Sequence, residues 1–396
     1  MVLKAIAWML LAVHIQAAAH AAGPPIVIGL DADLSANSAH AGRSIRRGAL
    51  IAIDEINGRG GVLGRHLALE ARDHRGNPLR AMENMADLAG KPDLAGVLGG
   101  IHTPAAMEVL PRVHEDRLPF LIPWAAGTEI VENGYHPNYV FRVSVSDAHA
   151  GPFLVDAAIS KGAQRLGLLL ESTVWGRSNH ASMTSAAAAR MLPKPTVQWF
   201  NWGADDFGPP LSAFRENGVE VILLAANPPE GLLLVRTLAA LPADQRLPVI
   251  SHWGITGADF PQQAGEALDA VDLSFLQTFS FAAPPFPDRA DALFAAHRRL
   301  FPGFKHPLDI PAAPGLAHAY DLVHLLAKAV AAAGTSDRTA VRDALETLSH
   351  HAGVMADYAP PFTARRHDAL GPDRYILARY NENGRIVPVE PQRSRP

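Results

Sequence analysis

Residues 96–129, GVLGGIHTPAAMEVLPRVHEDRLPFLIPWAAGTE, contain the pattern that decides the fold of this chain. They read as a short apolar strand, a Gly-Gly break, a helix, a second apolar strand at 119–123 and a loop of small residues. The helix begins at Thr103 and Pro104, because threonine at the N-cap and proline at the first helical position are typical of a helix start. The stretch therefore predicts a strand–helix–strand unit of an α/β fold.

The same unit has the features of a ligand site. A helix that opens just after the carboxyl end of a strand points unpaired backbone N–H groups and a partial positive charge into the crevice there. Open α/β sheets bind ligands in that crevice, and a carboxylate or phosphate suits it. A threonine that only caps its helix would give the same sequence, so the pattern by itself leaves both interpretations open.

Strands and helices alternate along the rest of the chain. Residues 26–30 form the continuous apolar run of a strand buried on both faces, and the alternation starts afresh after about residue 144. Late helices are expected at 289–300, 315–333 and 336–349. The fold class is thus α/β with two doubly wound, mostly parallel sheets. We expect one lobe from residues 24–144 plus 278–353, a second from 145–277 plus 354–396, and a ligand between them.

The N-terminal residues predict export. MVLKAIAWMLLAVHIQAAAHAA has one lysine, an apolar run and a small-residue end in which Ala19-His20-Ala21 fits a cleavage site. Residues 1–21 are therefore interpreted as a signal peptide. The chain has no cysteine, which excludes disulfides and thiol catalysis. A periplasmic location fits these features.

Composition and motifs exclude several functions. A net charge of −4 with 19% charged residues argues against nucleic acid as a partner. The sequence has no GxSxG elbow, phosphate-binding loop or HExxH motif, and its 18 histidines are scattered. Lone carboxylates near strand ends, such as Glu171, usually cap helices or bond to sheet edges. We therefore predict no enzyme activity, no metal site and no cofactor.

Three tryptophans favour a binding cleft. Trp124, Trp175 and Trp253 each follow a predicted strand, at or near the start of the next element. A single tryptophan belongs more often to a core than to a cleft. Three at corresponding places on two lobes are better explained by a cleft with aromatic walls.

The chain resembles the periplasmic ligand-binding proteins of ABC transporters, in the leucine/isoleucine/valine-binding class. The resemblance spans the chain beyond the predicted signal peptide, and the segments that carry it are IGLDADLSA, RRGALIAIDEINGRGGVLGRHLALEARDHRGNP, GVLGG, PFLIPWAAGTE, YVFRVSVSD, GVEVILLAANPPEGLLLVRTL and AHAYDLVHLLAKAV. It implies a type I binding-protein fold with three hinge crossings that closes on a small solute. The solute would then pass to a permease in the inner membrane.

The resemblance also implies a ligand site on the first lobe. The family's hydroxyl residue for the ligand carboxylate matches Thr103, beside His102. The loop with further carboxylate contacts matches Trp124, Ala125 and Ala126, and alanine replaces the family's hydroxyl at Ala126. An aromatic residue of an early loop falls near His40.

On the second lobe the match is weaker. The family's aromatic residue before a glycine matches Trp175, and an aromatic residue at a later helix start becomes Asn227. The acidic residue that takes the ammonium group of amino-acid ligands falls on Trp253. The carboxylate end of the site is thus partly retained and the amine end is not, which predicts a small apolar or aromatic ligand that bears a carboxylate.

Two other functions stay open. One is a sensory module of the same fold that docks on a membrane receptor, which needs the same cleft. The other is an ordinary branched-chain amino-acid binder, which would need another acidic residue to pair with the ammonium group of its ligand. In each case we expect a monomer that binds a small molecule.

Overall fold

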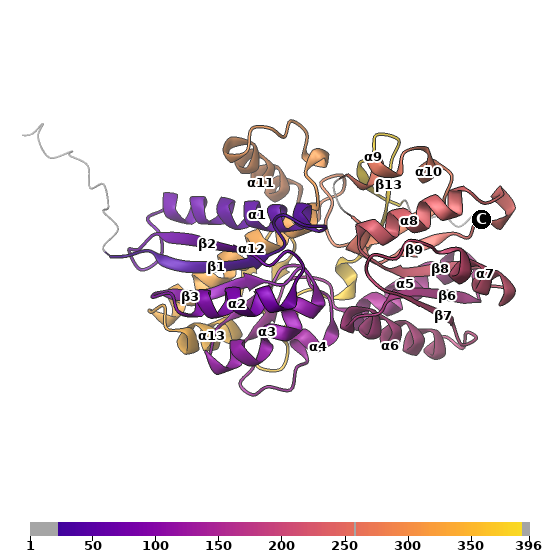
Figure 1. The fold of residues 1–396 in the computed structure, drawn as a ribbon. Coiled ribbons are helices and arrows are strands. Elements are labelled where there is room, and N and C mark those ends of the chain that lie inside the picture. The colour runs from indigo at the N-terminus through magenta and orange to yellow at the C-terminus, as the bar shows by residue number, and fades with distance from the viewer. Residues whose placement is uncertain (1–22, 257–258, 390–396) are drawn as a thin grey trace, which may run out of the picture.

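The computed structural model describes residues 23–256 and 259–389. Within these residues the chain forms two large sheets, each covered by helices, that lie beside one another (Figure 1). The predicted signal peptide lies outside the described residues. No helix in the described part combines the length and the apolar character needed to span a membrane.

The first sheet has five parallel strands in the order β2-β1-β3-β4-β5. The strands are β1 (Ile26–Ala32), β2 (Leu67–Asp73), β3 (Leu94–Gly99), β4 (Phe120–Ile122) and β5 (Val140–Arg142). Its helices are α1 (Ala39–Gly58), α2 (Pro78–Ala89), α3 (Thr103–Glu115), α4 (Thr128–Val131), α11 (Pro287–Leu300), α12 (Ala313–Ala333) and α13 (Arg338–Thr347). Helix α1 packs on α12, and α2 packs on α3.

Strand β3 shows why the strands of this sheet are apolar throughout. Successive side chains of a strand point to opposite faces of the sheet. Leu94 and Val97 join the apolar cluster under α2 and α3, whereas Ala95 and Leu98 join the cluster under α1 and α12. Both faces are buried, so no position of the strand tolerates contact with water.

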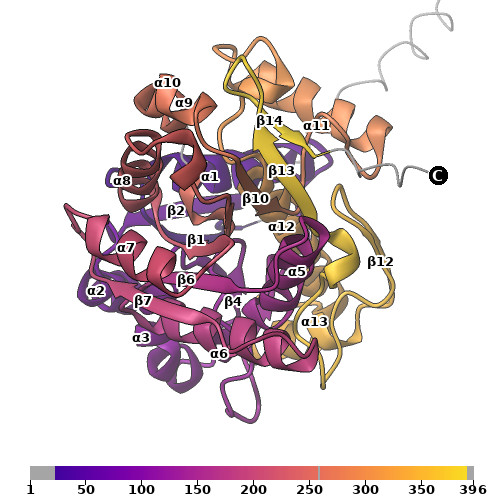
Figure 2. The same ribbon diagram turned by 90° about the vertical axis from the view of Figure 1, so that its right-hand side faces the viewer.

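The second sheet has seven strands in the order β14-β13-β10-β9-β8-β6-β7, and β13 runs antiparallel to its neighbours β10 and β14 (Figure 2). The strands are β6 (Leu166–Glu171), β7 (Thr196–Phe200), β8 (Val221–Ala225), β9 (Val249–Ser251), β10 (Leu273–Gln277), β13 (Ile376–Tyr380) and β14 (Ile386–Pro388). Its helices are α5 (Asp147–Ser160), α6 (Val174–Ala189), α7 (Gly208–Glu216), α8 (Pro228–Ala239), α9 (Phe260–Ala264) and α10 (Glu266–Asp269). A two-stranded ribbon, β11 (His351–Ala352) with β12 (Asp357–Tyr358), and the short 3-10 turns η1 (Ala243–Gln245), η2 (Trp253–Ile255), η3 (Pro307–Asp309) and η4 (Pro372–Arg374) complete the described part.

The chain passes between the two sheets three times: between β5 and α5, between β10 and α11, and between β12 and β13. This architecture confirms the predicted fold class. We call the elements packed on the first sheet the first lobe and those packed on the second sheet the second lobe.

The segment after residue 353 differs from its expected place. The N–H groups of Val354 and Met355 donate to the Asp321 carboxylate of α12, at 2.8 and 3.0 Å. Asp368 pairs with Arg142 at the end of β5. Residues 354–368 therefore pack on the first lobe, whereas the sequence assigned them to the second. Their partners are far away in the sequence, and the segment has no periodicity of its own that would reveal them.

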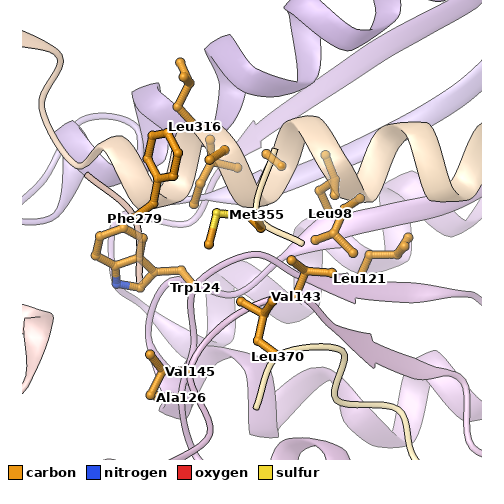
Figure 3. Close-up of a cluster of buried hydrophobic side chains, with 14 of the residues drawn as sticks. Leu98, Leu121, Trp124, Ala126, Val143, Val145, Phe279, Leu316, Met355 and Leu370 are labelled. Carbon is orange, nitrogen blue, oxygen red and sulfur yellow. The ribbon is translucent and has the colours of Figure 1, made fainter. Parts of the chain in front are cut away.

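A continuous apolar cluster joins the lobes at the hinge. Figure 3 shows Trp124 beside Phe279 of the second crossing, with Leu316 of α12 and Val145 of the first crossing nearby. The same cluster continues to Trp175 and Trp253 of the second lobe. The three tryptophans of interest therefore sit where the crossings and both lobes meet.

Candidate functional site

A cavity lies where the carboxyl ends of strands from both sheets face one another. Its empty volume is about 520 Å³, with open solvent at its mouth included. Residues that follow β1, β3, β4, β8 and β9, the last residue of β6 and Trp175 of α6 form its wall. The lining residues are Ser38, His40, Ala41, Ile101, His102, Thr103, Pro104, Trp124, Ala126, Glu171, Trp175, Asn227, Pro228, Trp253, Gly254 and Thr256.

The turn between β3 and α3 brings a polar edge to the cavity. Gly100 has a φ of +71°, a left-handed conformation that favours glycine, and this lets the chain turn sharply into the helix. The N-cap of α3 is His102, and Thr103 is the first helical residue, so the predicted N-cap at Thr103 is wrong by one position. The Thr103 hydroxyl instead accepts a hydrogen bond of 3.2 Å from the Gly127 N–H. Its own proton is therefore free to donate to a ligand.

The loop after β4 is held from behind. The Ser144 hydroxyl donates to the Trp124 carbonyl at 2.8 Å, and the Arg142 guanidinium donates to the Gly127 carbonyl at 2.8 Å. Arg142 is fully buried and also pairs with Asp368. Trp124 and Ala126 line the cavity, but the neighbouring Ala125 points away into the core under α3, and its N–H bonds to the Gly100 carbonyl at 3.1 Å.

A buried carboxylate lies behind His102. Asp33 accepts backbone hydrogen bonds from Ala36 at 2.7 Å and Ser38 at 2.9 Å, and its carboxylate lies 3.6 Å from the His102 Nε2. Burial opposes ionisation of Asp33, but the His102 contact and these two N–H groups hold its pKa at about 2. The buried His102 Nε2 has no hydrogen-bond partner among the described residues. The first lobe thus offers the Thr103 hydroxyl proton to the cavity, whereas the His102 Nε2 is turned toward Asp33.

The second lobe brings one acid to the cavity, and protein donors surround it. Glu171 accepts hydrogen bonds from the Trp202 indole at 2.8 Å, from the Asn227 amide at 2.9 Å and from the Thr173 hydroxyl. Burial raises the pKa of Glu171 despite these donors. Sequence reasoning noticed Glu171 but could not place it in a site, because Trp202 and Asn227 meet it only in the folded chain.

Trp253 and the residues beneath it fill the second-lobe side. Trp253 follows β9 in the turn η2, and its N–H donates to the His252 Nδ1 at 2.9 Å. The His252 Nε2 therefore carries the proton, and it lies 3.1 Å from the Asp147 carboxylate at the start of α5. Both side chains of this pair are fully buried. Neither Asp147 oxygen nor the His252 Nε2 makes a hydrogen bond among the described residues, so this buried contact is not a completed pair. The Trp253 ring still presents an apolar surface to the cavity.

Two indoles meet across the cleft. The rings of Trp124 and Trp253 stack with centroids 4.5 Å apart and an angle of 17° between their planes. His318 of α12 flanks Trp253 at 5.8 Å. It is fixed by bonds to the Pro123 carbonyl at 2.8 Å and the Thr278 hydroxyl at 2.9 Å, and burial lowers its pKa to about 4.

Further contacts hold the lobes together. The Thr128 N–H donates to the Ser178 hydroxyl at 3.2 Å, and the His40 Nε2 lies 3.3 Å from the Asp259 carboxylate. The edge of His102 meets Trp202 with centroids 5.7 Å apart. The structure is therefore a closed arrangement of the two lobes.

Eight of the nine predicted site residues line this one cavity, and Ala125 does not. The lining residues that the sequence did not predict are Ser38, Ala41, Ile101, Pro104, Glu171, Pro228, Gly254 and Thr256. The sequence places Glu171 near a strand end, and it is the last residue of β6, so its position at the carboxyl end was the available signal. Among residues 23–256 and 259–389, no three His, Cys, Asp or Glu side chains are grouped to hold a metal ion. The arrangement is suited to enclosing a small molecule with one polar end.

Comparison with known proteins gives a consistent result. Residues 25–385 match the sequence profile of a family described as periplasmic binding proteins. A Leu/Ile/Val-binding protein of Rhizobium johnstonii is 25% identical over 326 residues, which cover 81% of this chain and 83% of that protein. The crystal structure of a type 1 periplasmic binding protein from Bordetella pertussis superposes with a TM-score of 0.82 at 22% identity, over 92% of this chain and 100% of that one. A solute-binding protein of an ABC transporter from Rhodopseudomonas palustris, in complex with p-hydroxybenzoic acid, has a TM-score of 0.78 at 19% identity, over 92% and 95% of the two chains.

Proposed function

This chain belongs to the family of periplasmic binding proteins, in the leucine/isoleucine/valine-binding class, and from this premise we propose that it captures a small carboxylate with an apolar or aromatic body. The ligand has no free α-ammonium group. Capture takes place between the lobes by hinge closure, without chemical conversion, and the solute is delivered to the permease of an ABC transporter in the inner membrane. The binding protein acts as a monomer in the periplasm.

The observation that carries the ligand class is the engagement of Glu171. An ammonium group enclosed in a closed cleft needs an acidic partner, because an unpaired buried charge loses its hydration at a cost of several kcal/mol. Glu171 is the acid that lines the cavity, and three protein donors already occupy its oxygens. Burial also raises its pKa, which disfavours the ionised form that an ammonium group requires. Trp253 adds an apolar wall, since it is only 1% exposed.

The first lobe supplies the carboxylate end. The Thr103 hydroxyl proton and the first N–H groups of α3 lie at the same end of the cavity. The N-terminus of a 13-residue helix favours a negative charge through its unpaired N–H groups and its dipole. On the second lobe, Trp175 offers one more donor, because its buried Nε1 has no partner among the described residues. A ligand oxygen would satisfy these groups.

A branched-chain amino acid is the second candidate. Glu171 does line the cavity, and if Asn227 or Trp202 released it, the carboxylate would reach an ammonium group. The name of the Rhizobium johnstonii relative favours such ligands, whereas the p-hydroxybenzoic acid of the Rhodopseudomonas palustris complex favours a carboxylate without an amine.

Calorimetric titration with matched ligand pairs tests the proposal. Phenylpyruvate is compared with phenylalanine, and 2-ketoisocaproate with leucine, so that each pair differs mainly at the α-ammonium group. We expect the oxo acid to bind more tightly in each pair. Tighter binding of the amino acid in both pairs would reject the proposal in favour of the second candidate.

A further inference from the structure

We propose that the facing surfaces of Trp124 and Trp253 form a slot for a planar ring, so that the ligand is an aromatic acid and not a branched aliphatic one. The inference rests on the proposed function and narrows its ligand class. In the present arrangement the two indoles stack on one another at 4.5 Å and close the slot.

The two walls of the slot belong to different lobes. Trp124 follows β4 of the first sheet, and Trp253 follows β9 of the second. Their planes are within 17° of parallel, and neither ring is more than 6% exposed. Because the lobes are joined by a hinge, lobe opening changes the distance between the two rings.

The back of each indole is fixed within its surroundings. Behind Trp124 lies Gly315 of α12, where an added Cβ would be only 3.1 Å from the ring. Phe279 and Leu316 pack around the same side of Trp124 (Figure 3). On the second lobe, His252 lies edge-to-face with Trp253, with centroids 6.1 Å apart, whereas His318 of α12 contacts Trp253 from the first lobe. Trp124 is therefore held against α12, and Trp253 moves with the second lobe.

The geometry of insertion selects a flat molecule. A ring held between two indoles needs about 7 Å between their centroids, since stacked carbon atoms lie about 3.5 Å apart. Opening by about 2.5 Å from the observed spacing supplies this room, and both faces of the inserted ring then gain aromatic contact. A tetrahedral, branched carbon skeleton is thicker and cannot contact both indoles in this way.

The polar end of such a ligand has a place to go. Trp124, His102 and Thr103 line one cavity. A carboxylate attached to the inserted ring, directly or through a short linker, points from the slot toward the Thr103 hydroxyl and the N-terminus of α3.

The test compares benzoate with cyclohexanecarboxylate by calorimetric titration of the whole protein. The two acids share the carboxylate and the six-membered ring, and they differ in planarity. We expect benzoate to bind about tenfold more tightly or better, because two aromatic faces contribute to its binding alone. Trp253→Leu should reduce this preference to about twofold while Trp253→Phe retains most of it, since only phenylalanine keeps an aromatic face.

Trp199→Leu is the matched control. Trp199 is on β7, is 41% exposed and does not line the cavity, so its loss should leave the preference unchanged. Equal affinity of the wild-type protein for the two acids would overturn the slot and leave the carboxylate proposal standing. If neither acid binds, the slot is rejected too, and the oxo-acid pairs then decide the proposed function separately. The wild-type comparison stands even if a Trp253 variant fails to fold.

Discussion

The two edges of the cleft differ in the polar group that each offers to a ligand. On the first lobe, the Thr103 hydroxyl lines the cavity and accepts from the Gly127 N–H, so its proton can donate to a ligand. On the second lobe, Glu171 is the acid that lines the cavity, and three protein donors already bond to it. Buried polar groups are costly when unpaired, so the Thr103 hydroxyl gains from a ligand oxygen, whereas Glu171 has its partners in the protein.

This difference assigns the ends of the ligand. A molecule that binds here turns its oxygens toward the first lobe and its apolar body toward the second. Three substitutions test this assignment: one behind the first edge, one at the first edge itself, and one where the two lobes meet.

The largest effect is expected at Arg142, which supports the first edge from behind. Arg142→Met removes the partner of the Asp368 carboxylate, which is only 17% exposed, and leaves the Gly127 carbonyl without its donor. Removing one partner of a buried ion pair lowers the free energy of unfolding by about 3–5 kcal/mol. Chemical denaturation should show this loss in the free energy of unfolding, together with weaker ligand binding.

An exposed ion pair serves as the control for Arg142. Arg165 pairs with Glu220 where both side chains are largely in water, so Arg165→Met should cost less than about 1 kcal/mol. Equal losses in the two variants would show that the first edge does not depend on its buried support.

Local signals in the sequence predicted the elements well where the contacts are local. Helix α2 begins at Pro78 after Asn77, the same pairing of a capping residue with proline as Thr103-Pro104, and the Asn77 side chain accepts hydrogen bonds from the N–H groups of its own helix. At α3 the same reasoning missed by one residue, because the Thr103 hydroxyl bonds to Gly127 of another loop and not to its own helix. A cap can be recognised from neighbouring residues, but a side chain with a distant partner cannot.

The site follows the same rule. The sequence predicted eight of the residues that line the cavity, because strand ends and the family resemblance mark those positions. It gave no indication that Trp124 and Trp253 stack, or that Trp202 and Asn227 occupy Glu171. These contacts depend on how the two sheets face one another, and the crossings that set this geometry carry no periodic pattern.

The second prediction concerns the first edge itself. Thr103→Val keeps the shape of the side chain and removes its hydroxyl. We expect the affinity for a carboxylate ligand such as phenylpyruvate to fall by about 1.5–3 kcal/mol, the contribution of a hydrogen bond to a charged group. Stability should fall by about 1 kcal/mol, since the buried Gly127 N–H loses its acceptor.

Calorimetry and thermal melting separate these two roles of Thr103. Thr103→Ser retains the hydroxyl and should restore most of the affinity. A Thr103→Val protein that melts earlier but binds phenylpyruvate as tightly as the wild type would show that Thr103 only anchors the loop, and the polar edge would then have to lie elsewhere.

The smallest effect is expected at His318, on the seam where the first-lobe loop, the second crossing and Trp253 meet. Burial lowers its pKa to about 4 in the folded protein, from about 6.5 in an unfolded chain. The unfolded state therefore binds more protons than the folded state at mildly acidic pH, and stability falls as the pH falls below 6.5. From these two pKa values, His318 alone should cost about 1 kcal/mol between pH 7 and pH 5.5.

His318→Asn isolates this contribution. Asparagine is uncharged at every pH and can still donate to the Pro123 carbonyl, which accepts from His318 in the wild type. Burial also lowers the pKa of His74, His297 and His351, and these histidines titrate in both proteins, so their contributions cancel in the comparison. Urea denaturation of both proteins at pH 7 and pH 5.5 should give the variant a pH dependence that is smaller by about 1 kcal/mol. If the two proteins showed the same pH dependence of stability, His318 would be hydrated in solution. The stacked indoles beside it would then be less tightly enclosed than in the structure.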